Sequence, residues 1–121
     1  MKERKKQYFH PIEVTLDVVC GKWKGVILCL LQEKDYRFGE LKDQLFSVTP
    51  KVLTQQLREL EEDGLITRTV YPQVPPKVVY SLTPYGKDLE DTLRLMEKWG
   101  QSHQKKVGEN FDEDVSEAEL S

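Results

Sequence analysis

Residues 49–64 carry the pattern that most limits what this chain can fold into. Thr49 is suited to cap a helix N-terminus, and Pro50 suits the first helical position, where no N–H is needed. Gly64 suits the position that follows the last helical turn. The residues between them repeat an apolar side chain at helical spacing, at Leu53, Leu57 and Leu60. The stretch therefore predicts an amphipathic helix with one narrow face on a core.

The opposite face of this predicted helix is polar and carries Lys51, Gln55, Arg58 and Glu62, with Thr54 on its flank. Such side chains can donate to base edges and phosphates, which is typical of a DNA-recognition helix. The alternative is an ordinary solvated face. On this stretch alone the alternative is favoured, because Lys, Gln and Arg are common on any exposed helix.

The segments on either side of this helix favour the DNA interpretation. Helices are predicted over roughly 12–20, 23–33 and 39–46, and Ser47 and Val48 join the third tightly to the 50–63 helix. Two short helices joined in this way form a helix-turn-helix pattern. After Gly64 the apolar period becomes two, which predicts strands over 65–71 and 77–82 around a proline-rich turn. The order predicts a mainly α (α+β) winged helix-turn-helix with a two-stranded wing.

A long C-terminal helix should begin at the cap-plus-proline pair Thr83-Pro84 and run to about residue 106. Its apolar ridge exceeds what one hairpin and three short helices can cover, which indicates a subunit interface. The ridge consists of Leu89, Leu93, Met96 and Trp99.

Length and charge divide the 121 residues into three parts. Residues 1–9 form a basic arm, 10–108 form the winged-helix domain with its dimerisation helix, and 109–121 form an acidic tail that we expect to be flexible. The net charge of −3 does not argue against DNA, because residues 1–108 hold 18 basic and 15 acidic residues. No membrane span or secretory signal is recognisable, and two cysteines without a pairing pattern fit the cytoplasm.

Several motifs in order resemble one family over roughly residues 8–103. They are Pro11-Ile-Glu, Gly21-Lys-Trp-Lys24, Arg37-Phe38 with Glu40-Leu41, Leu53-Thr-Gln-Gln-Leu-Arg-Glu-Leu-Glu61, Asp63-Gly-Leu65, Val74-Pro-Pro76 and Tyr80-Ser-Leu-Thr-Pro84. The chain resembles the HxlR-type winged helix-turn-helix regulators of the MarR-like group. This resemblance implies a bacterial homodimer on a pseudo-palindromic operator, more often a repressor. It also implies dimerisation through the N-terminal segment and the long helix, by Phe9, Ile12, Leu89, Leu93, Met96 and Trp99. His10 stands where many members carry a sensing cysteine.

The DNA-contacting candidates form three groups. The recognition helix offers Lys51, Thr54, Gln55 and Arg58 to the major groove, and the wing offers Arg68 and Lys77 to the backbone or minor groove. Lys22, Lys24 and Arg37 are further phosphate candidates, for which a solvated role is equally open.

Other functions find little support in the sequence. No phosphate loop, nucleophile with a base, or paired catalytic carboxylates can be recognised, so we expect neither an enzyme nor a cofactor. His10 and His103 have no nearby ligand cluster, so we expect no metal site. The alternative function is a protein-interaction winged helix without DNA binding. The sequence leaves open whether a small-molecule effector exists, and it does not identify the target genes.

Overall fold

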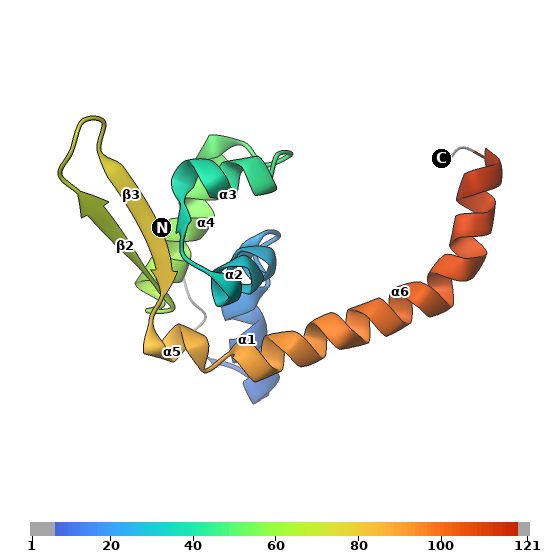
Figure 1. The fold of residues 1–121 in the computed structure, drawn as a ribbon. Helices are drawn as coiled ribbons and strands as arrows, with labels where there is room; N and C mark the ends of the chain where they lie inside the picture. The colour runs from blue at the N-terminus through green and yellow to red at the C-terminus, as the bar shows by residue number, and fades with distance from the viewer. Residues whose placement is uncertain (1–6, 119–121) are drawn as a thin grey trace. The chain divides into compact units, whose positions relative to one another are not determined.

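The computed structural model describes residues 7–118, with side chains to residue 108. The chain forms two compact units that divide between Glu90 and Asp91. The first unit contains five helices in chain order, among the described residues (Figure 1). They are α1 (Pro11–Val19), α2 (Lys24–Glu33), α3 (Phe38–Gln44), α4 (Pro50–Glu62) and α5 (Pro84–Lys87). The second unit begins at Asp91 and contains α6 (Glu90–Ala118) except for its first residue, Glu90.

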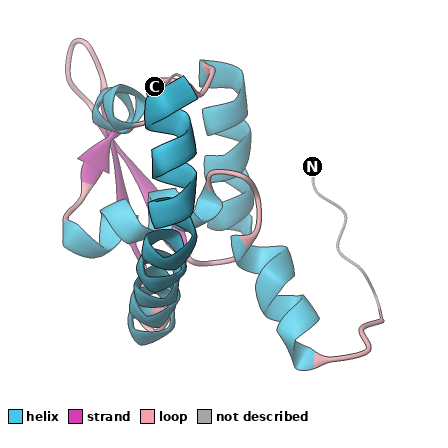
Figure 2. Ribbon diagram, turned by 90° about the vertical axis from the view of Figure 1, so that its right-hand side faces the viewer, coloured by secondary structure: helices cyan, strands magenta, loops and turns pink. Residues whose placement is uncertain are grey.

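One antiparallel sheet belongs to the first unit, and it has three strands rather than the two that we predicted. The strands are β1 (Tyr36–Arg37), β2 (Ile66–Tyr71) and β3 (Lys77–Leu82), in the order β1-β3-β2. The sequence indicated an extended piece near Arg37, but a two-residue strand is too short to show an alternating pattern. Its pairing, Tyr36 with Tyr80, becomes visible only in the fold. Figure 2 shows how small this sheet is beside the helices, and the predicted winged-helix class is confirmed.

The core is built around the predicted amphipathic helix. Leu53, Leu57 and Leu60 of α4 are all buried, as their spacing predicted. They share the buried interior with side chains from α2, α3 and the sheet, namely Ile27, Leu28, Leu31, Leu41, Tyr36, Ile66, Tyr80 and Leu82. Because three successive turns of α4 are held from one side, its other side stays available for a partner.

Both ends of α4 follow the local sequence signals. The Thr49 hydroxyl accepts a hydrogen bond from the backbone N–H of Val52 at 3.1 Å, and Pro50 occupies the first turn. Gly64 has φ +80°, a left-handed conformation that L side chains rarely adopt. The chain then turns directly into Leu65, whose N–H donates to the Leu60 carbonyl at 3.0 Å. These contacts set where the hairpin leaves the helix.

The single C-terminal helix predicted from Thr83 is two helices, α5 and α6. The Thr83 hydroxyl accepts from the Gly86 N–H at 2.9 Å and donates to the Gly64 carbonyl at 2.7 Å. A Cβ on Gly86 would lie 2.1 Å from the Leu65 carbonyl oxygen, so the first unit holds α5 closely. No apolar period in the sequence marks this break, which lies at residues 88–89.

The ends of the chain can be compared with the predicted arm and tail only in part. The backbone of α6 is helical to Ala118, so the helix continues through most of the acidic segment that we expected to be flexible. Residues 1–6 of the predicted basic arm and residues 119–121 lie outside the described part. Among the described helices, none combines the length and apolar character that a membrane crossing needs.

Candidate nucleic-acid interface

The outer face of α4, defined by Lys51, Thr54, Gln55 and Arg58, is directed away from the core. Lys51, Gln55 and Arg58 are exposed, and Thr54 is half-buried. Within the described part of the chain, neither Lys51 nor Arg58 forms an ion pair. Their positive charges are therefore available to an external anion. The structure brings all four predicted groove residues together on one helix.

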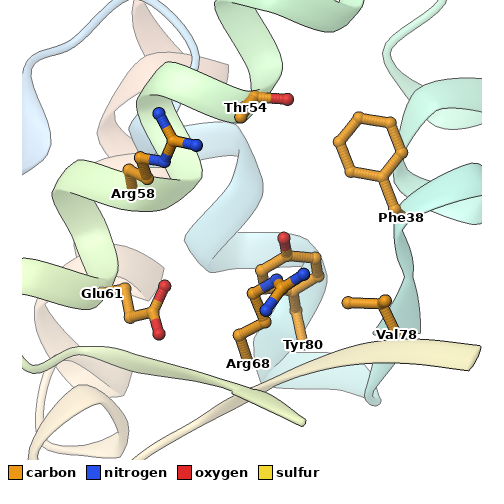
Figure 3. A pocket seen from close by; sticks show the side chains of 7 residues that line it. All are labelled: Phe38, Thr54, Arg58, Glu61, Arg68, Val78 and Tyr80. Atoms are coloured by element: carbon orange, nitrogen blue, oxygen red, sulfur yellow. The ribbon is translucent and has the colours of Figure 1, made fainter. Parts of the chain in front are cut away.

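An open cleft of about 560 Å³ lies between α4 and the sheet (Figure 3). Its lining comes from four elements and consists of Phe38, Thr54, Arg58, Glu61, Arg68, Val78 and Tyr80. Arg58 approaches from α4, while Arg68 lies on β2 opposite Tyr80 of β3. Two guanidinium groups on facing walls suit a phosphate, since arginine can bind its oxygens in a fork. The cleft thus joins the outer face of α4 to the wing.

The wing carries the other two predicted contacts on adjacent strands. Arg68 is exposed, and Lys77 is half-buried with its ammonium 5.1 Å from the centroid of the Tyr71 ring. That cation–π contact orients Lys77 without neutralising it. The connection through residues 72–76 is exposed throughout. The hairpin can therefore meet a flat or curved surface without rearranging the core.

Arg37 lies at the start of α3 and is exposed. Its backbone N–H donates to Glu40 Oε1 at 2.9 Å. This hydrogen bond is the main reason that the pKa of the Glu40 carboxyl is lowered, with Lys34, Arg37 and Lys77 adding charge attraction and desolvation opposing them. The Glu40 carboxylate therefore stabilises the N-terminal turn of α3 through its contact with the Arg37 backbone.

The prediction that Lys24 contacts phosphate is wrong for this structure. Lys24 is 2% exposed, and its ammonium forms an ion pair with the carboxylate of Glu59 on α4. A lysine enclosed in this way cannot reach DNA unless the first unit opens. Lys22, two residues earlier, is exposed, with its ammonium 5.2 Å from the Trp23 ring centroid. Only Lys22 of this pair remains a phosphate candidate.

Sequence reasoning missed Glu59, which connects the core to the outer face of α4. Its second carboxylate oxygen, Oε2, accepts a hydrogen bond from Gln55 Nε2 at 2.9 Å. The spacing of four residues on one helix is a signal that could have indicated this pair. The approach of Lys24 could not have been found, because it comes from a different helix.

The predicted dimer residues differ in exposure. Phe9, Ile12, Met96 and Trp99 are exposed, while Leu89 is half-buried and Leu93 is 5% exposed. The Trp99 ring stacks on His103 with centroids 4.9 Å apart. Four of the six apolar side chains are therefore open to a partner subunit.

The remaining reactive residues do not assemble a second kind of site. Within the described part of the chain, no group of three His, Cys, Asp or Glu side chains could hold a metal ion. Cys20 is exposed and Cys29 is half-buried, and neither is part of a disulfide in the described part of the chain. His10 caps α1, since its Nδ1 accepts from the Ile12 N–H at 3.1 Å.

Comparison with known proteins shows which family of proteins this chain is similar to. The model of the HxlR-like helix-turn-helix family matches residues 18–107. YtcD of Bacillus subtilis (strain 168), an HTH-type transcriptional regulator, is 52% identical over 108 residues, which are 88% of this chain and 86% of YtcD.

Solved structures agree with that comparison. The redox regulator HypR in its reduced form superposes with a TM-score of 0.78 at 48% identity, over 84% of this chain and 99% of HypR. A MarR-family regulator from Porphyromonas gingivalis W83 superposes with a TM-score of 0.73 at 31% identity, over 82% and 97% of the two chains. The resemblance drawn from the sequence motifs is confirmed. This chain belongs to the HxlR-like helix-turn-helix family, and it is a DNA-binding transcriptional regulator rather than an enzyme.

Proposed function

We propose that the protein binds a pseudo-palindromic operator as a homodimer and represses transcription in the cytoplasm. The outer face of α4 enters the major groove, where Arg suits guanine and Gln suits adenine. Phosphate or minor-groove contacts come from Arg68, Lys77, Lys22 and Arg37. The observation that carries the proposal is the exposed charge of Arg58, which has no ion-pair partner within the described residues, beside the cleft shared with Arg68. Half-sites should lie about one helical turn, ~10 base pairs, apart.

Redox sensing through the N-terminal cysteine that many family members carry is not part of the function proposed for this protein. HypR is named as a redox regulator, whereas this chain has His10 at the position where the sequence motif places that cysteine. A histidine that caps α1 offers no thiol for a disulfide.

Steep salt dependence should separate DNA binding from the alternative of a protein-interaction module. Each phosphate neutralised by Lys or Arg releases counterions, so a dimer with several phosphate contacts should lose about 10³-fold or more in affinity between roughly 50 and 200 mM salt. The measurement is fluorescence anisotropy with duplexes from upstream of its own gene, titrated at several salt concentrations. Failure to bind any such duplex at low salt would favour the interaction module.

Met96→Asp should weaken the homodimer, because it places a charge on an exposed apolar position of α6. We expect the dimer dissociation constant to rise at least tenfold, roughly 1.4 kcal/mol, as measured by sedimentation equilibrium. Gln101→Asp is the matched control, since Gln101 is an exposed polar residue of the same helix. A dissociation constant equal to that of the wild-type dimer for Met96→Asp would remove this position from the interface. Leu93 is a poorer test, because it is already buried in the single chain.

A further inference from the structure

The carboxylate of Glu59 contacts both a side chain from the core and a side chain on the outer face of α4. Oε1 pairs with the ammonium of Lys24, which is 2% exposed, and the Glu59 side chain is 13% exposed. Oε2 accepts from Gln55 Nε2 at 2.9 Å. The same carboxylate therefore joins a buried cation on α2 to an exposed amide on α4.

The surroundings of Lys24 leave its side chain little freedom to move. A Cβ added to Gly21 would lie 2.8 Å from Lys24 Cδ and 2.4 Å from Gln56 Oε1, so the backbone at Gly21 closes over both side chains. Burying an ammonium group is costly unless an opposite charge lies beside it, and Glu59 supplies that charge. The position of the Glu59 carboxylate is thus set by the packing of α2 against α4.

The chemistry of this contact selects one orientation of the Gln55 amide. An ionised carboxylate only accepts hydrogen bonds, so the NH₂ group of Gln55 must face Glu59 and the carbonyl oxygen must face away. One N–H and the carbonyl oxygen then remain for a ligand. That donor and acceptor are the pair that a glutamine needs to bind N7 and N6 of adenine together.

We propose that Glu59, held by Lys24, is a positioning residue that fixes the amide of Gln55 for reading an adenine edge in the major groove. The inference rests on the proposed function, since it requires α4 to lie in the groove. Glu59 itself touches no base. It supplies sequence discrimination by reducing the number of amide orientations that Gln55 would otherwise sample.

The test uses the full-length dimer and the tightest duplex selected by the wild type from random DNA, together with its single base-pair substitutions. The variant is Lys24→Met combined with Glu59→Met, which removes one positive and one negative charge and so keeps the net charge. At the base pair that Gln55 reads, we expect substitution to weaken binding by the wild type about tenfold. The same substitution should weaken binding by this variant less than about threefold. The salt slope and the other positions should be unchanged. Gln55→Ala should lose the same discrimination, and adding it to the double variant should cause no further loss.

The competing results are distinct. If Gln55→Ala removes discrimination as strongly in the double variant as in wild type, Glu59 does not position Gln55 and the inference is wrong. If Gln55→Ala alters discrimination nowhere, Gln55 reads no base and the inference again fails, while steep salt dependence would still support the proposed function. If the wild type selects no duplex at all, both the inference and the proposed function fail.

A second measurement on the unmodified protein does not depend on whether the double variant folds. The side-chain ¹⁵N relaxation of Gln55 in the free protein should report restricted motion, whereas Gln101, an exposed glutamine on α6, serves as the mobile reference. Motion of the Gln55 amide equal to that of Gln101 would overturn the inference.

Discussion

Lys24→Met is expected to lower the free energy of unfolding by about 3 kcal/mol, because it removes the ammonium that is ion-paired with the largely enclosed Glu59 carboxylate. Removing one partner of a buried ion pair typically costs about 3–5 kcal/mol, and the lower end applies because Glu59 keeps some contact with water. For a domain of this size that is a large share of the total stability. Urea unfolding followed by circular dichroism measures the change.

Two variants serve as controls for Lys24→Met. Lys22→Met removes the same charge two residues away at an exposed position and should change stability by no more than about 0.5 kcal/mol. Lys24→Met together with Glu59→Met should recover most of the loss, since two apolar side chains can replace a buried pair at little cost. If Lys24→Met and Lys22→Met unfold at the same urea concentration, Lys24 is not enclosed with Glu59 in solution.

Arg58→Ala is expected to weaken operator binding by about 10- to 100-fold while leaving the dimer folded. Arg58 is exposed on the outer face of α4 and lines the cleft with Arg68, so its loss removes a DNA contact without opening the core. A well-placed arginine contributes about 1–3 kcal/mol when it reads a base. Anisotropy titrations with the selected duplex, and with its substituted versions, measure the change.

The pattern of affinity loss in Arg58→Ala distinguishes a base contact from a phosphate contact. A base contact would relax discrimination at one base pair, whereas a phosphate contact would weaken all duplexes alike and reduce the salt slope by about one. Lys87→Ala removes one positive charge from an exposed position on α5, outside the proposed surface, and is the control. Wild-type affinity for every duplex after Arg58→Ala would contradict the assignment of the outer face of α4.

Local patterns along the chain were sufficient for the winged-helix class. The leucine spacing of 53–60 identified the buried face of α4, and Thr49, Pro50 and Gly64 marked its ends within a residue. Both strands of the hairpin were recognised from the change of period at Gly64. Each of these signals lies within a few residues of the structure it predicts, so no long-range contact was needed.

Contacts between distant segments account for what the sequence did not reveal. The strand at Tyr36–Arg37 exists because it pairs with Tyr80 and Val79 of β3, which are remote from it along the chain. The placement of α5 depends on the close approach of Gly86 to the Leu65 carbonyl. In both cases the decisive partner is remote in sequence, and the residues themselves have no distinctive spacing.

The two lysines of Gly21-Lys-Trp-Lys24 show most clearly the difference between what local sequence sets and what tertiary contacts set. By itself the sequence determined that α4 would be amphipathic, with Lys51, Thr54, Gln55 and Arg58 on its outer face, because helical geometry sets that from spacing alone. It could not separate Lys22 from Lys24, since both are lysines beside a helix start. Only the tertiary structure decided that one stays in solvent and the other is buried against Glu59. The physical reason is that the packing of α2 on α4 determines which side chain loses its water, and burial requires that one to find an opposite charge.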